Sequence, residues 1–157
     1  YRPFKLDKIL DRRVSDLSGG ELQKLAISVC LAADADIYLL DEPSAYLDVE
    51  ERLAMAKAVR RIVENLGRVA FVVEHDILVQ DFIADRLMVF SGIPGVKGYG
   101  YKPTDMRSGM NMFLKELGIT FRRDRQTYRP RANKEDSRLD RMQKELGEYY
   151  YVTIDEE

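Results

Sequence analysis

The sequence has very little cysteine, no long apolar run and no strong excess of either charge. Cys30 is the only cysteine among 157 residues, which excludes a disulfide within the chain and an iron–sulfur cluster or zinc site built from this chain alone. No apolar run approaches the roughly 18 residues that a membrane-spanning helix needs, and no signal peptide is recognisable. Because the formal net charge is −2, the chain should not coat nucleic acid generally, and any contact with RNA must come from a local patch.

The residues that are present are typical of a folded domain with a real core. Hydrophobic residues make up 45% of the chain and charged residues 33%, as in ordinary globular proteins. Cys30 shares a helical stripe with Leu22, Leu25, Ala26 and Val29. We therefore interpret it as a small core residue and not as a reactive thiol.

The most informative stretch runs from Leu17 to Asp48 and begins with LSGGELQ. Ser18 stands at a helix N-cap position, and Glu21 three residues later completes an S-x-x-E capping box. A helix is therefore predicted to begin at Gly19, with the apolar positions 22, 25, 26, 29, 30 and 33 on one packed side. Its unpaired N–H groups, its glycines and the positive end of its dipole indicate an anion site, for which phosphate is the natural ligand.

Two apolar runs end in polar residues that can carry chemistry. Ile37 to Leu40 has the pattern of a buried parallel strand, and Asp41 and Glu42 follow at its carboxyl end. The run from Val69 to Glu74 ends at His75, the only histidine. Since strands alternate with helices, we predict a parallel α/β sheet, and such sheets place their chemistry at the carboxyl ends of the strands.

Local signals predict the remaining elements. Asp48 and Glu51 form a second possible capping box before a helix that runs to about Leu66 and ends at Gly67, with Leu53, Ala56, Val59, Val63 and Leu66 buried. Further predicted elements are a helix at 77–84, a strand at 86–90, a glycine-rich hairpin or loop at 91–101, a helix from Ser108 to Leu117 and a helix at 136–146.

Taken together, these motifs resemble those of the ATP-binding cassette (ABC) ATPases. Ser18, Gly19, Gly20 and Glu21 resemble the family signature, the pair Asp41 and Glu42 resembles Walker B, residues 44–48 resemble the D-loop, and His75 resembles the switch histidine. They occur in the order and at the spacing of the family. The resemblance implies an α/β, P-loop NTPase fold of ABC type, with a signature helix, a Walker B strand and a parallel sheet, and ATP and Mg²⁺ as ligands.

The strand-end residues are the candidate catalytic groups. Glu42 is expected to act as a general base or to polarise the attacking water, and the resemblance makes His75 a sensor of the γ-phosphate. Asp41 is expected to bind Mg²⁺ through water, because this hard cation prefers carboxylate oxygen and keeps part of its hydration shell. The alternative is that Asp41 and Glu42 only cap a strand end.

The resemblance gives the signature a role outside its own domain. Ser18, Gly19, Gly20 and Glu21 would contact the γ-phosphate held by a facing domain, and the segment from Ser44 to Asp48 would cross the interface between the two domains. Asp48 is therefore counted among the nucleotide-binding residues. Alternatively, Ser18 and Glu21 merely cap a helix, and both roles can hold together.

The phosphate-binding loop of these ATPases is missing. None of the ten glycines is followed by lysine, so the chain holds no G-x-x-x-x-G-K-[ST] motif. We therefore expect residues 1–104 to be the carboxyl-terminal part of a nucleotide-binding domain, inactive alone and completed by the amino-terminal half of the same domain.

Residues 105–157 are expected to form a C-terminal helical or hinge extension. Its segment 121–134 combines the aromatic residues Phe121 and Tyr128 with one acidic residue, Asp124, and with the basic residues Arg122, Arg123, Arg125, Arg129, Arg131 and Lys134. Arginine binds phosphate well, and aromatic rings can stack on bases. The segment is either a solvated or intramolecular charge run or a contact to RNA or to a sister domain.

The extension resembles one family of cassettes, the class E or RNase L inhibitor proteins, which split ribosomes for recycling in translation termination and initiation. The carrying segments are 106–111, 119–124, 129–131 and 147–151. The resemblance implies the second of two nucleotide-binding domains plus a hinge, in a cytoplasmic ATPase with no membrane contact. Its implied partners are a sister nucleotide-binding domain, the small ribosomal subunit, a release or rescue factor and ribosomal RNA, and iron–sulfur clusters would lie in an N-terminal domain outside this chain.

Two other functions stay open from the sequence. An ATPase subunit of another cassette class, such as a transporter or a different translation or DNA-repair cassette, would share residues 17–76 but lack the tail. An inert ABC-like interaction module would not need the pair of Glu42 and His75.

Overall fold

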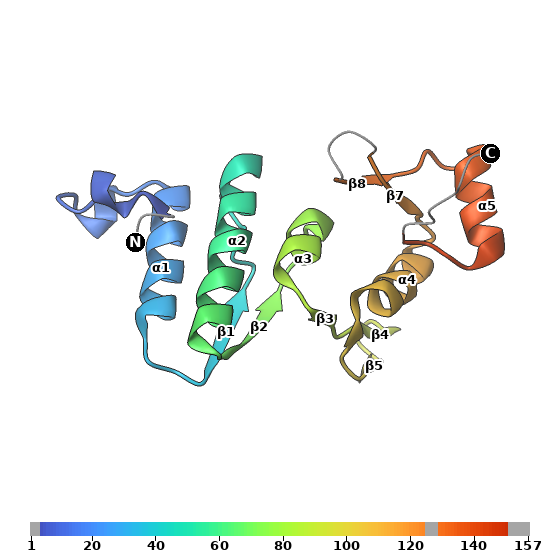
Figure 1. Ribbon diagram of the computed structural model, residues 1–157, viewed down its shortest axis with the longest axis horizontal. Coiled ribbons are helices and arrows are strands. Elements are labelled where there is room, and N and C mark those ends of the chain that lie inside the picture. Colours follow the sequence, from blue (N-terminus) through green and yellow to red (C-terminus); the bar gives the residue numbers. More distant parts are fainter. Residues whose placement is uncertain (1–3, 125–128, 151–157) are drawn as a thin grey trace. The chain divides into compact units, whose positions relative to one another are not determined.

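The computed structural model describes residues 4–124 and 129–150. Contacts divide the chain into two compact units, unit 1 at Tyr1–Ile83 and unit 2 at Ala84–Glu157 (Figure 1). The division after residue 104 that the motifs suggested stays a prediction. Three residues used in the sequence argument, Arg125, Tyr128 and Tyr151, lie outside the described residues.

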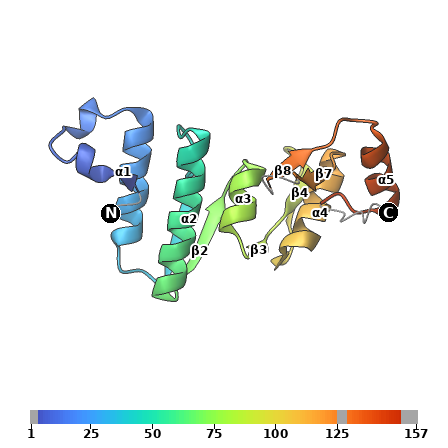
Figure 2. The same cartoon turned by 45° about the horizontal axis from the view of Figure 1, so that its top comes forward.

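Unit 1 is an α/β unit. Its elements are η2 (Leu6–Lys8), η3 (Val14–Asp16), α1 (Gly19–Ala32), β1 (Ile37–Asp41), α2 (Val49–Leu66), β2 (Val69–Val73) and α3 (Ile77–Ile83). Strands β1 and β2 pair in parallel, with Leu39 opposite Phe71. The three α-helices stand side by side (Figure 1; Figure 2). The predicted start of the first helix, the strand at 69–73 and the parallel pairing are confirmed.

The core of unit 1 lies on one face of the two strands. Tyr38 and Leu40 point into an apolar cluster with Ile27 and Leu31 of α1, and helix α2 contributes further buried residues, namely Met55, Ala56, Ala58 and Val59. Alternate residues of β1 point the other way, and Leu39 is 72% exposed. The expected burial of β1 is therefore only half right, because the described helices cover a single face of the strand pair.

The buried side of α1 also differs from the predicted one. Ile27, Ser28 and Leu31 are buried, whereas Leu22 and Val29 of the predicted stripe are exposed. Apolar residues surround nearly the whole of this helix, so periodicity alone did not single out the face that packs. Cys30 is half-buried and packs against the apolar cluster, as expected for a core residue.

Helix α2 is capped at both ends, although not entirely as predicted. Asp48 accepts a hydrogen bond from the backbone N–H of Glu51, and Gly67 ends the helix in a left-handed conformation with φ of 61°. The second capping box does not close, because the Glu51 carboxylate accepts a 2.6 Å hydrogen bond from Lys24 Nζ instead. Leu66 is exposed and not buried, because it lies in the last turn of the helix.

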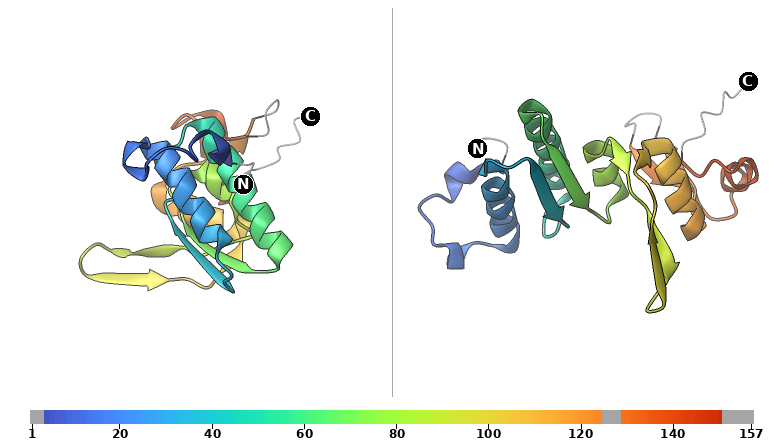
Figure 3. Two further views of the ribbon diagram at one scale, coloured as in Figure 1. Left: turned by 90° about the vertical axis from the view of Figure 1, so that its left-hand side faces the viewer. Right: turned by 90° about the horizontal axis from the view of Figure 1, so that it is seen from below.

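Unit 2 is built from short strands and two helices. Its elements are β3 (Arg86–Leu87), β4 (Phe90–Ile93), β5 (Lys97–Gly100), β6 (Thr104–Asp105), α4 (Met106–Leu117), β7 (Phe121–Arg123), β8 (Pro130–Ala132) and α5 (Arg138–Leu146). The predicted strand at 86–90 is split: β3 pairs antiparallel with β6, and Phe90 begins β4. Strands β4 and β5 form the predicted hairpin, which extends as a two-stranded ribbon (Figure 3).

The helix caps of unit 2 were partly misassigned. Asp105, and not Ser108, caps α4: the backbone N–H of Ser108 donates a 3.0 Å hydrogen bond to Asp105 Oδ1. That hydrogen bond lowers the pKa of Asp105. Ser137 caps α5, so this helix begins at Arg138 and not at 136. The predicted ends of the two helices, at Leu117 before Gly118 and at Leu146, are confirmed.

A buried polar cluster holds β7, β8 and α5 together. Thr120 Oγ1 donates a 2.6 Å hydrogen bond to Asp140 Oδ1, and Asn133 Nδ2 donates to Thr120 Oγ1 at 2.8 Å. Gln143 Nε2 donates to the carbonyl oxygens of Phe121 and Glu148 at 3.0 and 2.9 Å. Thr120, Asp140 and Gln143 are almost fully buried, so these hydrogen bonds replace contacts with water.

Within the part of the chain that the structure describes, no helix is both long and apolar enough to cross a lipid bilayer.

Candidate functional site

The carboxyl ends of β1 and β2 lie side by side and bring Glu42 and His75 into contact. Asp41 is the register partner of Val73, and the backbone N–H of Glu42 donates a 2.9 Å hydrogen bond to the Val73 carbonyl oxygen. His75 Nε2 donates to Glu42 Oε1 at 2.8 Å. Both side chains are largely exposed, at 78% for His75 and 52% for Glu42. The pair is thus preformed and open to a ligand.

The backbone between β1 and α2 is held in an unusual conformation. Glu42 and Tyr46 both adopt the left-handed region, with φ of 45° and 61°. Such conformations are costly for residues other than glycine and cluster at functional sites. Two backbone hydrogen bonds close the turn, from the N–H of Ala45 to the Glu42 carbonyl at 3.0 Å and from that of Leu47 to the Ser44 carbonyl at 3.2 Å. Ser44 is buried.

Asp41 lies at the tip of β1 in the same exposed row as Ile37 and Leu39. Among the described residues, no group of three or more metal-binding side chains is present. An exposed carboxylate can reach a divalent cation that keeps its hydration shell, so Asp41 fits the expected contact with Mg²⁺ through water, which stays a prediction.

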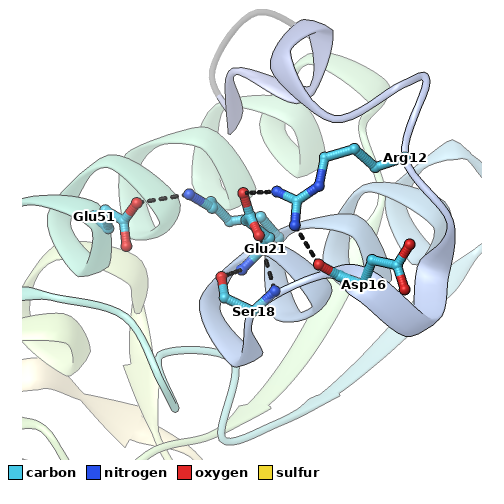
Figure 4. Close-up of polar contacts among 6 residues, drawn as sticks. Arg12, Asp16, Ser18, Glu21 and Glu51 are labelled. Atoms are coloured by element: carbon cyan, nitrogen blue, oxygen red, sulfur yellow. Dashed lines mark hydrogen bonds and ion pairs between the residues drawn. The ribbon is translucent and has the colours of Figure 1, made fainter.

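The signature residues form the predicted capping box at the start of α1 (Figure 4). Ser18 Oγ accepts from the Glu21 N–H at 3.3 Å, and Glu21 Oε2 accepts from the Ser18 N–H at 2.8 Å. This bond from the Ser18 N–H, with help from the Arg12 guanidinium 2.8 Å from Glu21 Oε1, holds the pKa of Glu21 below its usual value. The Ser18 hydroxyl only accepts here, so it can still donate to an anion.

The first N–H groups of α1 are available to a ligand. Within residues 4–124 and 129–150, the backbone N–H groups of Gly19 and Gly20 have no hydrogen-bond partner. A Cβ on Gly20 would lie 2.9 Å from the Tyr46 carbonyl oxygen, so a side chain there would collide with the turn after β1. Glycine is therefore required where the signature meets the residues that follow Glu42.

Two residues that were not predicted, Gln23 and Lys24, join α1 to the strand tip and to α2. Gln23 Nε2 donates a 3.3 Å hydrogen bond to the Glu42 carbonyl oxygen. Lys24 pairs with Glu51 at 2.6 Å. No local pattern marks these partners, because each contact joins residues of separate elements. They place the signature and the pair of Glu42 and His75 on one connected framework, and Asp48 at the start of α2 belongs to it as the helix cap.

The basic segment of unit 2 is a β-hairpin. Arg122 of β7 lies directly opposite Arg131 of β8, so their side chains share one face. Arg131 is neutralised in part by Asp124, with NH1 to Oδ2 at 3.2 Å. Arg122, Arg123 and Arg129 are exposed, and Arg125 lies outside the described residues. The hairpin therefore presents arginines on its surface, and Arg131 forms an ion pair with Asp124.

The model of one protein family matches the beginning of the chain. This family is described as ABC transporter, and the matched residues are 2–45. The chain is also similar to an uncharacterised ABC transporter ATP-binding protein of Methanocaldococcus jannaschii, with 63% identity over 96% of this chain and 25% of that protein. The chain thus spans about a quarter of the length of the curated relatives it matches.

Solved structures resemble the chain over nearly its whole length. An archaeal ribosome recycling factor in complex with the archaeal ribosomal stalk protein is 59% identical, with a TM-score of 0.90 over 96% of this chain and 29% of that one. A model of ribosome-bound archaeal Pelota and the class E ABC protein is 58% identical, with a TM-score of 0.92 over 96% of this chain and 26% of that one.

Proposed function

This chain belongs to the class E family of ABC ATPases, and from that membership we propose that it is the carboxyl-terminal part of the second nucleotide-binding domain of an ATPase that splits and recycles ribosomes. Residues 1–104 are the nucleotide-binding part and residues 105–157 the hinge extension. The domain is completed by an amino-terminal half that carries the phosphate loop. Because it acts on ribosomes, the protein is expected in the cytoplasm.

The observation that carries this proposal is the 2.8 Å hydrogen bond between His75 and Glu42 at adjoining strand tips. Glu42 accepts a proton from, or polarises, a water molecule in line with the γ-phosphate of ATP. His75 holds Glu42 in place and presents an imidazole to the same phosphate. An inert interaction module would not need to keep this pair preformed and exposed.

ATP supplies the phosphoryl group, and bound Mg²⁺ neutralises part of its charge. Asp41 would hold the cation through water, because its carboxylate is exposed at the end of β1, next to Glu42. Residues of this chain bind and orient the nucleotide at this edge of the sheet, while the phosphate loop of the other half holds the phosphates.

The signature serves a sister domain. Ser18 offers a hydroxyl, and Gly19 and Gly20 offer N–H groups to the γ-phosphate bound by that domain, whereas Glu21 keeps the helix N-terminus formed through its capping box. Asp48 caps α2 and so fixes the segment 44–48 that faces the sister domain. Closure of two such domains on ATP moves the attached parts, and hydrolysis reopens them.

The basic segment 121–134 contacts the ribosome. Its arginines (Arg122, Arg123, Arg125, Arg129 and Arg131) supply forks for RNA phosphates and brace the hinge. The protein's partners are the small ribosomal subunit and a release or rescue factor; a similar solved structure is described as ribosome-bound together with Pelota. The iron–sulfur clusters of the resemblance belong to an N-terminal domain, since this chain has one cysteine.

The test of the ATPase proposal is Glu42→Gln in the full-length protein. We expect ATP hydrolysis to fall by at least about 100-fold while ATP stays bound and the domains stay closed. Glu50→Gln, on the exposed first turn of α2, serves as the control and should leave hydrolysis unchanged. Rapid turnover by the Glu42 variant would refute its role in activating water.

The test of the ribosome contact is Arg122→Ala combined with Arg123→Ala, measured as ribosome affinity over a salt series. Each lost phosphate contact should lower the slope of log affinity against log salt by about 0.7 to 1. Arg138→Ala, on the exposed start of α5, is the control. An unchanged slope would leave the hairpin arginines with a structural role only.

A further inference from the structure

One arginine on the first turn of α2 joins the two loops that flank the strand tips. Arg52 Nε donates a 2.9 Å hydrogen bond to the carbonyl oxygen of Leu47, and Arg52 NH1 donates a 2.9 Å hydrogen bond to Asp76 Oδ2. Leu47 belongs to the segment 44–48, and Asp76 directly follows His75. A single planar guanidinium therefore links the backbone of one loop to the side chain of the other.

The loop that carries His75 is held from its other side as well. Glu74 Oε1 accepts hydrogen bonds from the backbone N–H groups of His75 at 2.9 Å and Asp76 at 3.2 Å. Asp76 Oδ1 accepts from the backbone N–H of Leu78 at 2.9 Å. Both carboxylate oxygens of Asp76 are thus engaged, and its position depends on Arg52 and on the start of α3.

The contacts of Arg52 with Leu47 and Asp76 fix the positions of the two loops more than they stabilise the fold. The side chains of Arg52 and Asp76 are 36% and 26% exposed, and an ion pair at such a site contributes little to folding stability. Because one guanidinium holds both partners, a shift of the Leu47 carbonyl would be passed to Asp76 and from there to the adjacent His75. A misplacement of about 1 Å in a catalytic group is enough to slow a reaction about 100-fold.

We propose that Arg52 is a positioning residue that couples the segment 44–48 to His75. When the facing domain displaces this segment, Arg52 moves the His75 loop and thereby sets the contact between His75 and Glu42. This inference rests on the proposed ATPase function, because it assigns a positioning role at the same site. In this role Arg52 contacts neither the nucleotide nor the attacking water.

The test uses the full-length ATPase with Arg52→Ala, Arg52→Lys and Asp76→Asn. We expect kcat to fall by about tenfold or more in Arg52→Ala while KM for ATP changes by less than about twofold, because binding groups stay in place. Arg52→Lys keeps the charge but cannot donate to both acceptors in the same geometry, so it should recover only a small part of the loss. It also serves as the folded variant should the alanine variant not fold.

Arg60→Ala is the matched control. Arg60 lies on the same helix, its side chain is also 36% exposed, and it pairs with Glu64 at 2.8 Å. Its kcat should stay within about twofold of the parent protein, as expected for an exposed pair on a helix surface. A loss equal to that of Arg52→Ala would make the Arg52 effect a general helix effect and overturn the proposal.

A double-mutant cycle separates coupling from independent damage. Arg52→Ala and Asp76→Asn together should cost no more than the larger single loss, because both break one link. Multiplying losses, or a kcat within twofold of the parent for Arg52→Ala, would overturn the coupling. If Glu42→Gln still abolishes hydrolysis in that case, the inference fails alone, whereas normal hydrolysis by Glu42→Gln would bring down the ATPase proposal itself.

Discussion

Both units bury apolar side chains, but unit 2 also buries a carboxylate and an amide side chain, those of Asp140 and Gln143. The apolar cluster of unit 1 gathers Ile27, Leu31, Tyr38, Leu40 and others between the helices and one face of the strands. In unit 2, the segment after α4 is instead held by Thr120, Asp140 and Gln143. An apolar cluster tolerates repacking, while buried hydrogen bonds demand every partner. Unit 1 thus carries the candidate catalytic residues on an apolar scaffold, whereas the buried hydrogen bonds of unit 2 fix the shape of the β7–β8 hairpin.

Hydrogen bonds in unit 2 also hold two carboxylates, those of Asp140 and Glu148. Burial raises the pKa of Asp140, but the hydrogen bonds from Thr120 and Lys144 outweigh it and hold that pKa below its usual value. Hydrogen bonds from Arg107 and then from Asn111 lower the pKa of Glu148. These carboxylates therefore stay ionised at neutral pH, and their ionised forms help to hold unit 2 together.

The largest effect is expected for a change in the apolar cluster of unit 1. Leu31→Ala removes a side chain that is only 2% exposed, and should lower the free energy of unfolding of this chain by about 2 to 5 kcal/mol. Urea denaturation measures this, and hydrogen exchange should speed up within 19–73. Leu22→Ala, the same change at an exposed site of α1, should cost less than about 1 kcal/mol. Equal losses at both sites would show that the cluster does not stabilise unit 1.

A smaller effect is expected for a change in the buried polar cluster of unit 2. Gln143→Leu keeps roughly the volume but leaves the carbonyl oxygens of Phe121 and Glu148 without this donor. Because an unsatisfied buried polar group costs about 1 to 3 kcal/mol, the free energy of unfolding should fall by about 2 to 3 kcal/mol. Hydrogen exchange should become faster only within 119–150. Glu145→Gln on the exposed side of α5 is the control. A neutral or stabilising Gln143→Leu would show that packing, and not hydrogen bonding, holds this segment.

The smallest effect is a pH dependence of unit 2. Because the folded-state pKa of Glu148 is lowered, its stabilisation is fully present above the usual glutamate pKa of about 4.3 and is lost as pH falls toward the folded value. Glu148→Gln should therefore destabilise the chain at pH 7 and matter progressively less below about pH 4. Denaturation curves at several pH values measure this, and a constant difference between the two proteins would contradict it.

Local signals predicted the elements better than their packing. The box of Ser18 and Glu21 and the glycine ends at Gly67 and Gly118 depend on neighbouring residues, and they were found where expected. The buried face of α1 and the cap of α4 were misassigned, because several residues competed for each role. At the site, the strand ends and His75 could be read from motifs, but Gln23 and Arg52 could not, since their partners come from other elements.

The sequence by itself determined the family, the helix starts and the residues at the strand tips, because motif spacing and capping are properties of short stretches. Only the tertiary structure decided that His75 reaches Glu42, that Gly20 meets Tyr46 and that Arg52 bridges Leu47 and Asp76. The physical reason is that such contacts depend on how parallel strands and neighbouring helices bring distant segments within a few ångströms, and no local pattern encodes that distance.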